Sequence, residues 1–189
     1  MADIDRQHWN QRYRDGAYDF SPAAWLVKRE ALLRPTRLNA RALDLACGVG
    51  RNSVYLAGLG YAVDAWDISD VGLNLLRAEL ARRRVAGQPL AVTPRQVDVD
   101  AAELPAAFYD LVLDACFLDR SLFPAMLSAL RSGGLLVVHT LLRRTAEDDR
   151  NPDYLLEPGE LRALTAGLDV VDAEEDPVGG WAGLVARRR

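Results

Sequence analysis

Three aspartates stand close to the ends of apolar runs and are the residues best placed to do chemistry. Asp44 lies in the run that leads into the glycine turn 48–50, Asp67 ends a second run, and Asp98 follows a third. A glycine turn after a buried strand lets a ligand approach the backbone at a helix N-terminus, where N–H groups attract an anion. A carboxylate before the same turn attracts a cation and repels a pyrophosphate. The pattern therefore predicts a ligand that carries both an anionic and a cationic group.

S-adenosylmethionine meets this description, because it presents a carboxylate, an ammonium, a sulfonium, a ribose diol and an adenine. We expect Asp44 to face the ammonium and Asp67 to accept hydrogen bonds from the ribose hydroxyls. We expect Asp98 to accept a hydrogen bond from the amino group of the adenine. As alternatives, Asp44 could hydrogen-bond the backbone of its own turn, and Asp67 could cap the next helix. Ser69 and Asp70 can also serve as that cap. The cofactor-binding residues predicted from position are Asp44, Ala46, Cys47, Gly48, Gly50, Arg51, Asn52, Asp67, Ile68, Asp98, Val99, Asp114 and Ala115.

The acceptor side gives weaker signals. His139, at the end of a later apolar run, is a weak candidate for a general base, and the alternative is a histidine packed beside Thr140. A base is needed only if the acceptor must lose a proton. Because a sulfonium is already activated, proximity alone can lower the barrier by about 7–11 kcal/mol. We therefore assign no catalytic residue beyond His139, and we predict tentative substrate contacts from His139 and Tyr154.

The order of predicted elements places these residues at one edge of a sheet. An α/β fold follows from the alternation of strand-like and helical patterns, with a doubly wound, Rossmann-like sheet that has helices on both faces. No helical pattern separates the last two strands, which predicts an antiparallel C-terminal strand in a seven-stranded, mostly parallel sheet. The predicted strands are 42–46, 62–67, 90–97, 109–115, 135–140, 169–174 and 181–186. The predicted helices are 4–15, 23–33, 52–59, 69–84, 120–131 and 157–164.

The length of 189 residues predicts a single domain, 1–189. Within it we expect an N-terminal helical cover at 1–40 and a core sheet at 41–189. The charged segment 141–157 is long for a loop in a compact domain, which indicates a possible lid over the substrate.

Composition narrows the choice of partners. A net charge of −4 and a pI near 5.2 lack the basic footprint of a nucleic-acid-binding protein. No apolar run reaches membrane-spanning length, and the first residues are charged where a signal peptide would be hydrophobic. Cys47 and Cys116 do not have the spacing of a zinc site. We expect a small-molecule substrate, no nucleic acid, no membrane, no metal and a cytoplasmic location, and we make no prediction of the oligomeric state.

The run from Asp44 to Ser53, continued by the run from Tyr61 to Asp67, resembles the class I S-adenosylmethionine-dependent methyltransferases. Within that class it is most similar to the small bacterial tellurite-resistance type. The resemblance implies methyl transfer to a small molecule by in-line displacement, with S-adenosylhomocysteine as the product. The segment that contains Trp9 and Tyr13 is similar to one that covers the cofactor in such enzymes, which implies that both lie near its methionine end.

The chain departs from the tellurite-resistance pattern between its last two strands. That family carries a longer insertion with His and Arg there, whereas this chain has the short link 177–180. The resemblance therefore does not imply a particular acceptor.

Two rival functions remain at this point. An NAD-type oxidoreductase would use a similar turn, but Ser53 replaces the third glycine of its motif and Asp44 opposes a pyrophosphate. A non-enzymatic module that binds S-adenosylmethionine is compatible with the lack of an obvious general base.

Overall fold

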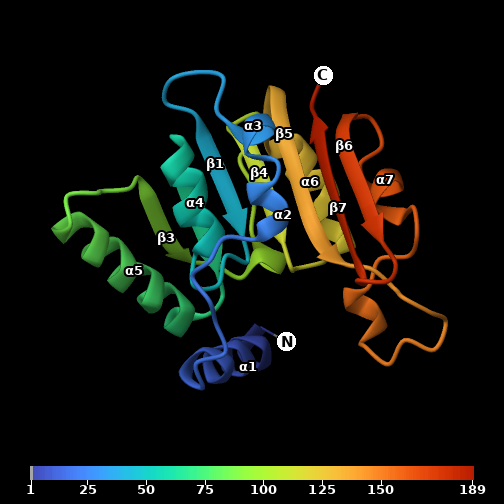
Figure 1. The fold of residues 1–189 in the computed structure, drawn as a ribbon, viewed down its shortest axis with the longest axis horizontal. Coiled ribbons are helices and arrows are strands. Elements are labelled where there is room, and N and C mark those ends of the chain that lie inside the picture. Colours follow the sequence, from blue (N-terminus) through green and yellow to red (C-terminus); the bar gives the residue numbers. More distant parts are fainter. Residues whose placement is uncertain (1) are drawn as a thin grey trace. The chain divides into compact units, whose positions relative to one another are not determined.

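The computed structural model describes residues 2–189, and seven strands in this part of the chain form one mixed sheet (Figure 1). The strand order is β3-β2-β1-β4-β5-β7-β6. β1–β2, β2–β3 and β4–β5 are parallel pairs, and β7 is antiparallel to both of its neighbours. This arrangement confirms the predicted fold class. The strands are β1 (Arg41–Leu45), β2 (Ala62–Asp67), β3 (Val92–Gln96), β4 (Tyr109–Ala115), β5 (Leu130–Leu141), β6 (Asp169–Asp176) and β7 (Trp181–Arg187).

Contacts divide the chain into two compact units, with the boundary between Ala102 and Glu103. The first unit contains β1 to β3 and the second contains β4 to β7. The predicted single domain is not tested by this division and stays a prediction.

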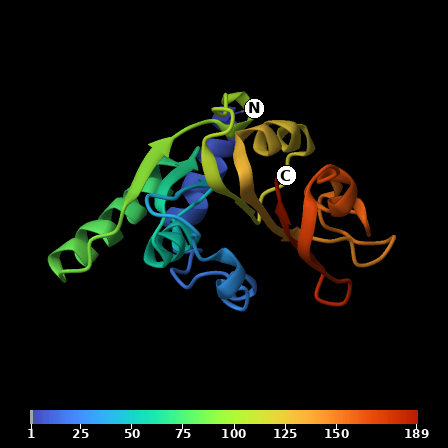
Figure 2. The ribbon, with the colours of Figure 1, turned by 90° about the horizontal axis from the view of Figure 1, so that it is seen from above.

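The first unit carries the glycine turn and most of the helices. α4 follows β1 and α5 follows β2, as parallel crossovers require. Val54 of α4 and Leu76 of α5 pack with Ala65 of β2 in a buried cluster, and α5 lies along β3 in both views (Figures 1 and 2). The helices of this unit are α1 (Ala2–Arg14), α2 (Ala24–Val27), α3 (Glu30–Leu33), α4 (Arg51–Leu59), α5 (Asp70–Val85) and the 3₁₀ helix η1 (Val99–Ala101).

The predicted helix 23–33 was wrong in one respect, because the structure divides it into α2 and α3. Arg29 has φ −109° and ψ 14°, which interrupts the helix. Its guanidinium lies 3.7 Å from the ring centroid of Trp25 and donates a hydrogen bond to the Trp25 carbonyl oxygen at 3.4 Å. This side chain therefore competes for a carbonyl that a continuous helix would use.

The second unit consists of β4 to β7 with short helices. Phe123 and Met126 of α6 are buried, and α7 packs against β7. β6 forms an edge of the sheet, and acidic residues along it disfavour pairing with another strand. The helices here are η2 (Arg120–Leu122), α6 (Phe123–Ala129), η3 (Pro152–Tyr154) and α7 (Glu160–Leu164).

The predicted helix 120–131 was too long at its C-terminal end. It consists of η2 followed by α6, and β5 already begins at Leu130. Leu130 pairs with Tyr109 of β4, and both side chains are fully buried. Burial of this pair extends the strand by five residues beyond its predicted start at residue 135 and ends the helix early.

Candidate functional site

The turn after β1 has the backbone geometry of a ligand-binding loop. Ala46, Gly48 and Gly50 all have positive φ, at 49°, 60° and 73°. A Cβ at Gly50 would lie 2.5 Å from a methyl carbon of Leu76, so the close packing of α5 also requires glycine there. Ala46 adopts this conformation despite its side chain, and strain of this kind is concentrated at functional sites. The turn is fixed by Cys47, whose N–H donates to the carbonyl oxygen of Trp66 at 2.9 Å.

Asp44 is buried at the base of this turn. Its side chain is 1% exposed, and the hydroxyl of Ser53 donates a hydrogen bond to Asp44 Oδ2 at 2.5 Å. Burial raises the pKa of Asp44 to about 7, and the nearby charge of Asp67 acts in the same direction. The bond from Ser53 and the charge of Arg51 oppose this rise. Asp44 therefore changes its charge close to neutral pH.

Asp67 connects the ends of β1 and β2. Its Oδ2 accepts the N–H of Gly48 at 2.7 Å and its Oδ1 accepts the N–H of Ser69 at 2.7 Å. Burial raises the pKa of Asp67, while the two backbone N–H groups lower it. The cap of α5 is Ser69, whose Oγ accepts the N–H of Gly72 at 3.0 Å. Each carboxylate oxygen of Asp67 retains a second lone pair, so it can accept a further hydrogen bond of the kind that a ribose hydroxyl donates.

The end of β3 lies beside the same turn. Val97 donates its N–H to the carbonyl oxygen of Asp67 at 3.0 Å, and the Gln96 amide donates to the carbonyl oxygen of Ile68 at 3.1 Å. Asp98 follows directly and caps η1 by accepting the N–H of Asp100 at 3.3 Å. The structure thus gathers the predicted residues of the first unit at the carboxyl ends of β1, β2 and β3. Their contacts with a ligand stay predictions.

α1 covers this edge with aromatic side chains. The Tyr13 hydroxyl oxygen lies 2.5 Å from the position that a Cβ would take at Gly48, so a side chain there would collide with it. A carbon of the Tyr13 ring lies 2.9 Å from the position that a Cβ would take at Gly72. Burial, followed by the charge of Asp67, raises the pKa of Tyr13 far above its usual value, so its hydroxyl stays protonated. Trp9 stacks on Tyr13 with ring centroids 6.1 Å apart and is 38% exposed.

Sequence reasoning missed several residues that hold this edge together. A polar helix gives no sign that Asn10 is buried against Ser69 and Asp70, and the sequence marks Ser53 only as a departure from a glycine motif. The detectable signal was Gly72, a glycine near the start of a helical pattern, which often marks a close approach of another group. Ser69, one of the two predicted caps, has that role in the structure.

The second unit brings together a different set of predicted residues. Asp114 is buried in β4, and Ala115 pairs with His139 of β5. His139 is half-buried, with its ring centroid 5.4 Å from that of Trp181. Cys116 has φ 63° and donates its N–H to the carbonyl oxygen of His139 at 2.8 Å. Asp114, Ala115 and His139 are therefore neighbours, and no further role is assigned to them by this geometry.

The predicted lid forms a closed loop over residues 142–157. Leu142 and Leu156 form a bridge at its base, and Leu155 and Leu156 are fully buried. Tyr154 lies in η3 and is 53% exposed.

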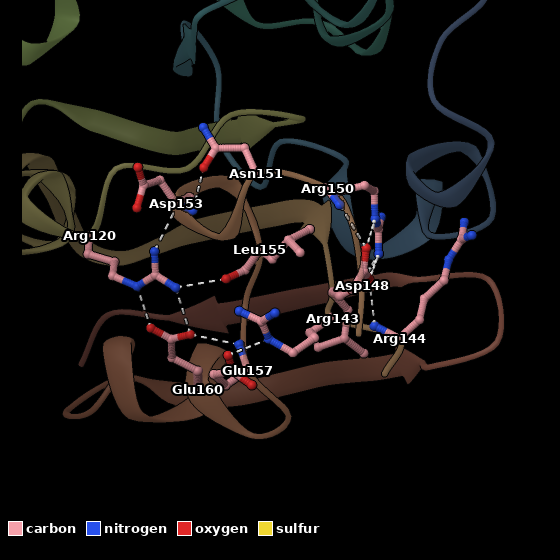
Figure 3. A network of polar contacts seen from close by, with 11 residues as sticks. Arg120, Arg143, Arg144, Asp148, Arg150, Asn151, Asp153, Leu155, Glu157 and Glu160 are labelled. Carbon is pink, nitrogen blue, oxygen red and sulfur yellow. Dashed lines mark hydrogen bonds and ion pairs between the residues drawn. The ribbon is translucent and has the colours of Figure 1, made fainter. Parts of the chain in front are cut away.

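Arg120 fastens this loop to α7 (Figure 3). Its guanidinium donates to both carboxylate oxygens of Glu160, at 2.5 and 3.0 Å. It also donates to the carbonyl oxygens of Asp153, at 3.1 Å, and Leu155, at 2.8 Å. One planar side chain thus fixes two parts of the chain, a geometry that a lysine could not reproduce.

Arg150 holds the other side of the loop (Figure 3). It pairs with Asp148 at 2.6 Å and donates to the carbonyl oxygen of Leu142 at 2.7 Å. Arg143 pairs with Glu157 at 2.6 Å. The loop therefore has a defined internal structure, and its role as a lid stays a prediction.

Residues 2–189 contain no cluster of three or more His, Cys, Asp or Glu side chains that could hold a metal ion. In the same part of the chain, no helix is long and apolar enough to cross a membrane.

One curated relative matches about half of the chain. A probable S-adenosyl-L-methionine-dependent methyltransferase TehB from Haemophilus influenzae is 30% identical over 94 residues. The match covers 48% of this chain and 31% of that protein, so the chain spans about a third of the relative's length.

Solved structures share the fold. The crystal structure of TehB from Haemophilus influenzae matches with a TM-score of 0.72 at 21% identity, covering 97% of this chain and 67% of that one. Magnesium protoporphyrin IX methyltransferase from Synechocystis PCC 6803, crystallised with bound SAM, matches with a TM-score of 0.70 at 18% identity, covering 100% and 97%.

The comparison with protein families covers most of the sequence. Residues 15–173 match the family described as tellurite resistance protein TehB, and this range includes the glycine turn, Asp44 and Asp67. The chain therefore belongs to the TehB family.

Proposed function

We propose that this protein transfers a methyl group from S-adenosylmethionine to a small-molecule acceptor. The observation that carries the proposal is the buried pair of Asp44 and Ser53 beneath the glycine turn. Ser53 occupies the place of the third glycine in a dinucleotide motif and donates its hydrogen bond to Asp44. A carboxylate held at that point repels a pyrophosphate and attracts the ammonium of a methionyl group.

The proposed cofactor site uses three groups in the first unit. The N–H groups at the start of α4 receive the carboxylate of the methionyl moiety, because the helix N-terminus favours an anion. Asp44 faces its ammonium, and Asp67 accepts from the ribose diol. When bound, S-adenosylmethionine supplies an activated methyl group, so the protein has to orient the donor and exclude water.

Family membership supports the proposed cofactor, since a curated relative bears the name of a probable S-adenosyl-L-methionine-dependent methyltransferase. The acceptor is proposed as a small molecule because the net charge of −4 gives no attraction for nucleic acid. A cytoplasmic, bacterial setting remains part of the same proposal.

Label transfer tests the reaction. The protein is incubated with S-adenosylmethionine labelled at its methyl group and a panel of thiols, amines, phenols, tellurite and selenite. We expect label in at least one acceptor, together with S-adenosylhomocysteine. Binding of the donor without transfer to any acceptor in the panel would favour the non-enzymatic module.

A substitution tests the ribose contact. We expect Asp67→Ala to weaken binding of S-adenosylhomocysteine by about tenfold or more, the result of losing hydrogen bonds to a charged group. Asp100→Ala is the matched control, because Asp100 is an exposed acid on η1 of the same unit. Equal affinity in the two folded variants would show that Asp67 serves the turn alone.

A further inference from the structure

Asn10 is a buried amide on a helix whose other polar residues are mostly exposed. It is 7% exposed, and its Nδ2 donates a hydrogen bond to Asp70 Oδ1 at 2.8 Å. Its Oδ1 accepts the hydroxyl of Ser69 at 2.6 Å and lies 3.4 Å from the N–H of Val71. A buried amide satisfied on both sides fixes one arrangement of the groups around it. These bonds join α1 to the first turn of α5 (Figure 1).

The same bonds continue into the proposed cofactor site. The Ser69 hydroxyl donates a hydrogen bond to Asn10, which fixes the position of Ser69. The backbone N–H of Ser69 in turn donates to Asp67 Oδ1. The second oxygen of Asp67 accepts the N–H of Gly48. A continuous chain of hydrogen bonds therefore runs from α1 through Ser69 and Asp67 to the glycine turn.

Tyr13 adds a second link on the same face of α1, because residues three apart in a helix are neighbours. Its ring packs against Gly48 and Gly72, the two positions where a side chain would collide with it. α1 thus contacts both loops that surround the proposed ribose and methionyl subsites. Asn10 and Tyr13 supply the contacts that hold α1 in this place, since the rest of the helix is largely solvated.

We infer that Asn10 is a positioning residue that couples the docking of α1 to cofactor binding by holding Ser69, and through it Asp67, in the binding geometry. This inference rests on the proposed function, because it assumes that Asp67 contacts the ribose. Asn10 itself does not touch the cofactor. A cofactor that stabilises the Asp67 turn then also stabilises docked α1, and by linkage docked α1 raises the affinity for the cofactor.

The first test is a double-mutant cycle read out by calorimetric titration with S-adenosylhomocysteine. We expect Asn10→Ala to weaken binding about tenfold in the wild-type background, the effect of losing one well-formed hydrogen bond. In the Asp67→Asn background, the same change should alter the affinity by less than about twofold, because the residue through which Asn10 acts is already altered. A merely structural effect would weaken binding equally in both backgrounds, and that result would overturn the inference.

Gln11→Ala is the matched control. Gln11 is the next residue of α1, is exposed, and its side-chain amide donates a hydrogen bond to Asp15, just after the helix, at 2.8 Å. The control should bind S-adenosylhomocysteine as the wild type does. If Asn10→Ala also binds as tightly as the wild type, the inference is wrong.

Proteolysis gives a second readout of the coupling. Trypsin cleaves after Arg12 and Arg14 at the end of α1, and we expect S-adenosylhomocysteine to slow this cleavage in the wild type and in Gln11→Ala. In Asn10→Ala the protection should be lost at saturating ligand. Equal protection in all three proteins would contradict the coupling.

Folding of the variants is checked by thermal unfolding. Should Asn10→Ala not fold, Asn10→Ser keeps one hydrogen-bonding group and should show the same pattern with a loss of about threefold. Failure of the wild type to bind S-adenosylhomocysteine would overturn the proposed function itself, and the inference with it.

Discussion

The buried carboxyl of Asp44 makes the stability of the protein depend on pH in a defined direction. Its pKa is 3.8 in an unfolded chain and about 7 in the folded protein. Between these values the folded state binds more protons than the unfolded state, so the free energy of unfolding falls as the pH rises. Below about pH 3 and above about pH 8 this group contributes almost no further change. Asp44→Asn removes the titrating group while keeping an oxygen that accepts from Ser53.

The magnitude follows from the two pKa values. At about 1.4 kcal/mol for each pKa unit, ionised Asp44 costs the folded state about 4 kcal/mol at pH 8. Of this, about 1.4 kcal/mol of the free energy of unfolding is lost between pH 6 and pH 8. This range lies above the pI near 5.2, so the net charge keeps the protein in solution during the measurement. Such a change is a large share of the 5–15 kcal/mol typical of a folded domain, roughly a tenth to a quarter.

Urea unfolding at pH 6, 7 and 8 measures this difference. The wild type should lose about 1.4 kcal/mol more than Asp44→Asn over this range. Asp67, whose pKa burial also raises, is present in both proteins, so the difference between them reports the ionisation of Asp44 together with its coupling to Asp67. Parallel curves for the two proteins would refute the reasoning, because they would show that Asp44 does not change its charge near neutral pH.

Two further substitutions test the packing around the site and the loop. Gly72→Ala should weaken binding of S-adenosylhomocysteine, because its Cβ would lie 2.9 Å from the Tyr13 ring. Gly58→Ala is the control: the space around Gly58 is open, so this change should leave the affinity unchanged and raise the free energy of unfolding by about 0.5–1 kcal/mol. Calorimetry measures the affinities and urea unfolding the stabilities, and equal affinities in the two variants would count against a role for α1. Arg120→Ala should speed tryptic cleavage within residues 142–157 and lower the free energy of unfolding by about 1–3 kcal/mol, because the loop loses its bonds to that guanidinium. Arg77→Ala is the control, because it removes one exposed hydrogen bond to Asn74, and it should change neither the cleavage nor the free energy of unfolding. Unchanged cleavage in Arg120→Ala would mean that the loop is held by other contacts.

Much of the fold was predictable because its signals are local. β2 and β4 begin and end where their apolar runs predict, at 62–67 and 109–115. The cap at Ser69 also follows from side-chain chemistry within one turn. The C-terminal end of helix 120–131 was predicted wrongly because a distant contact decided the outcome: Leu130 pairs with Tyr109 of β4.

The acidic residues of the candidate site could be predicted from the sequence, whereas the residues that hold them in place could not. Asp44 and Asp67 could be chosen because strand ends and a glycine turn mark their positions. The role of Asn10 could not, since its partner Asp70 lies 60 residues away and nothing in a polar helix marks one amide for burial. Ser53 could be recognised as a departure from a glycine motif, but its bond to Asp44 depends on how α4 packs over β1.

Calorimetric titration of the wild-type protein with S-adenosylhomocysteine and with NAD tests the central claim most directly. At about pH 8, where Asp44 is ionised, the account predicts saturable binding of S-adenosylhomocysteine and no detectable binding of NAD, because Asp44 attracts the ammonium of the first and repels the pyrophosphate of the second. Tight binding of NAD without a response to S-adenosylhomocysteine would contradict it.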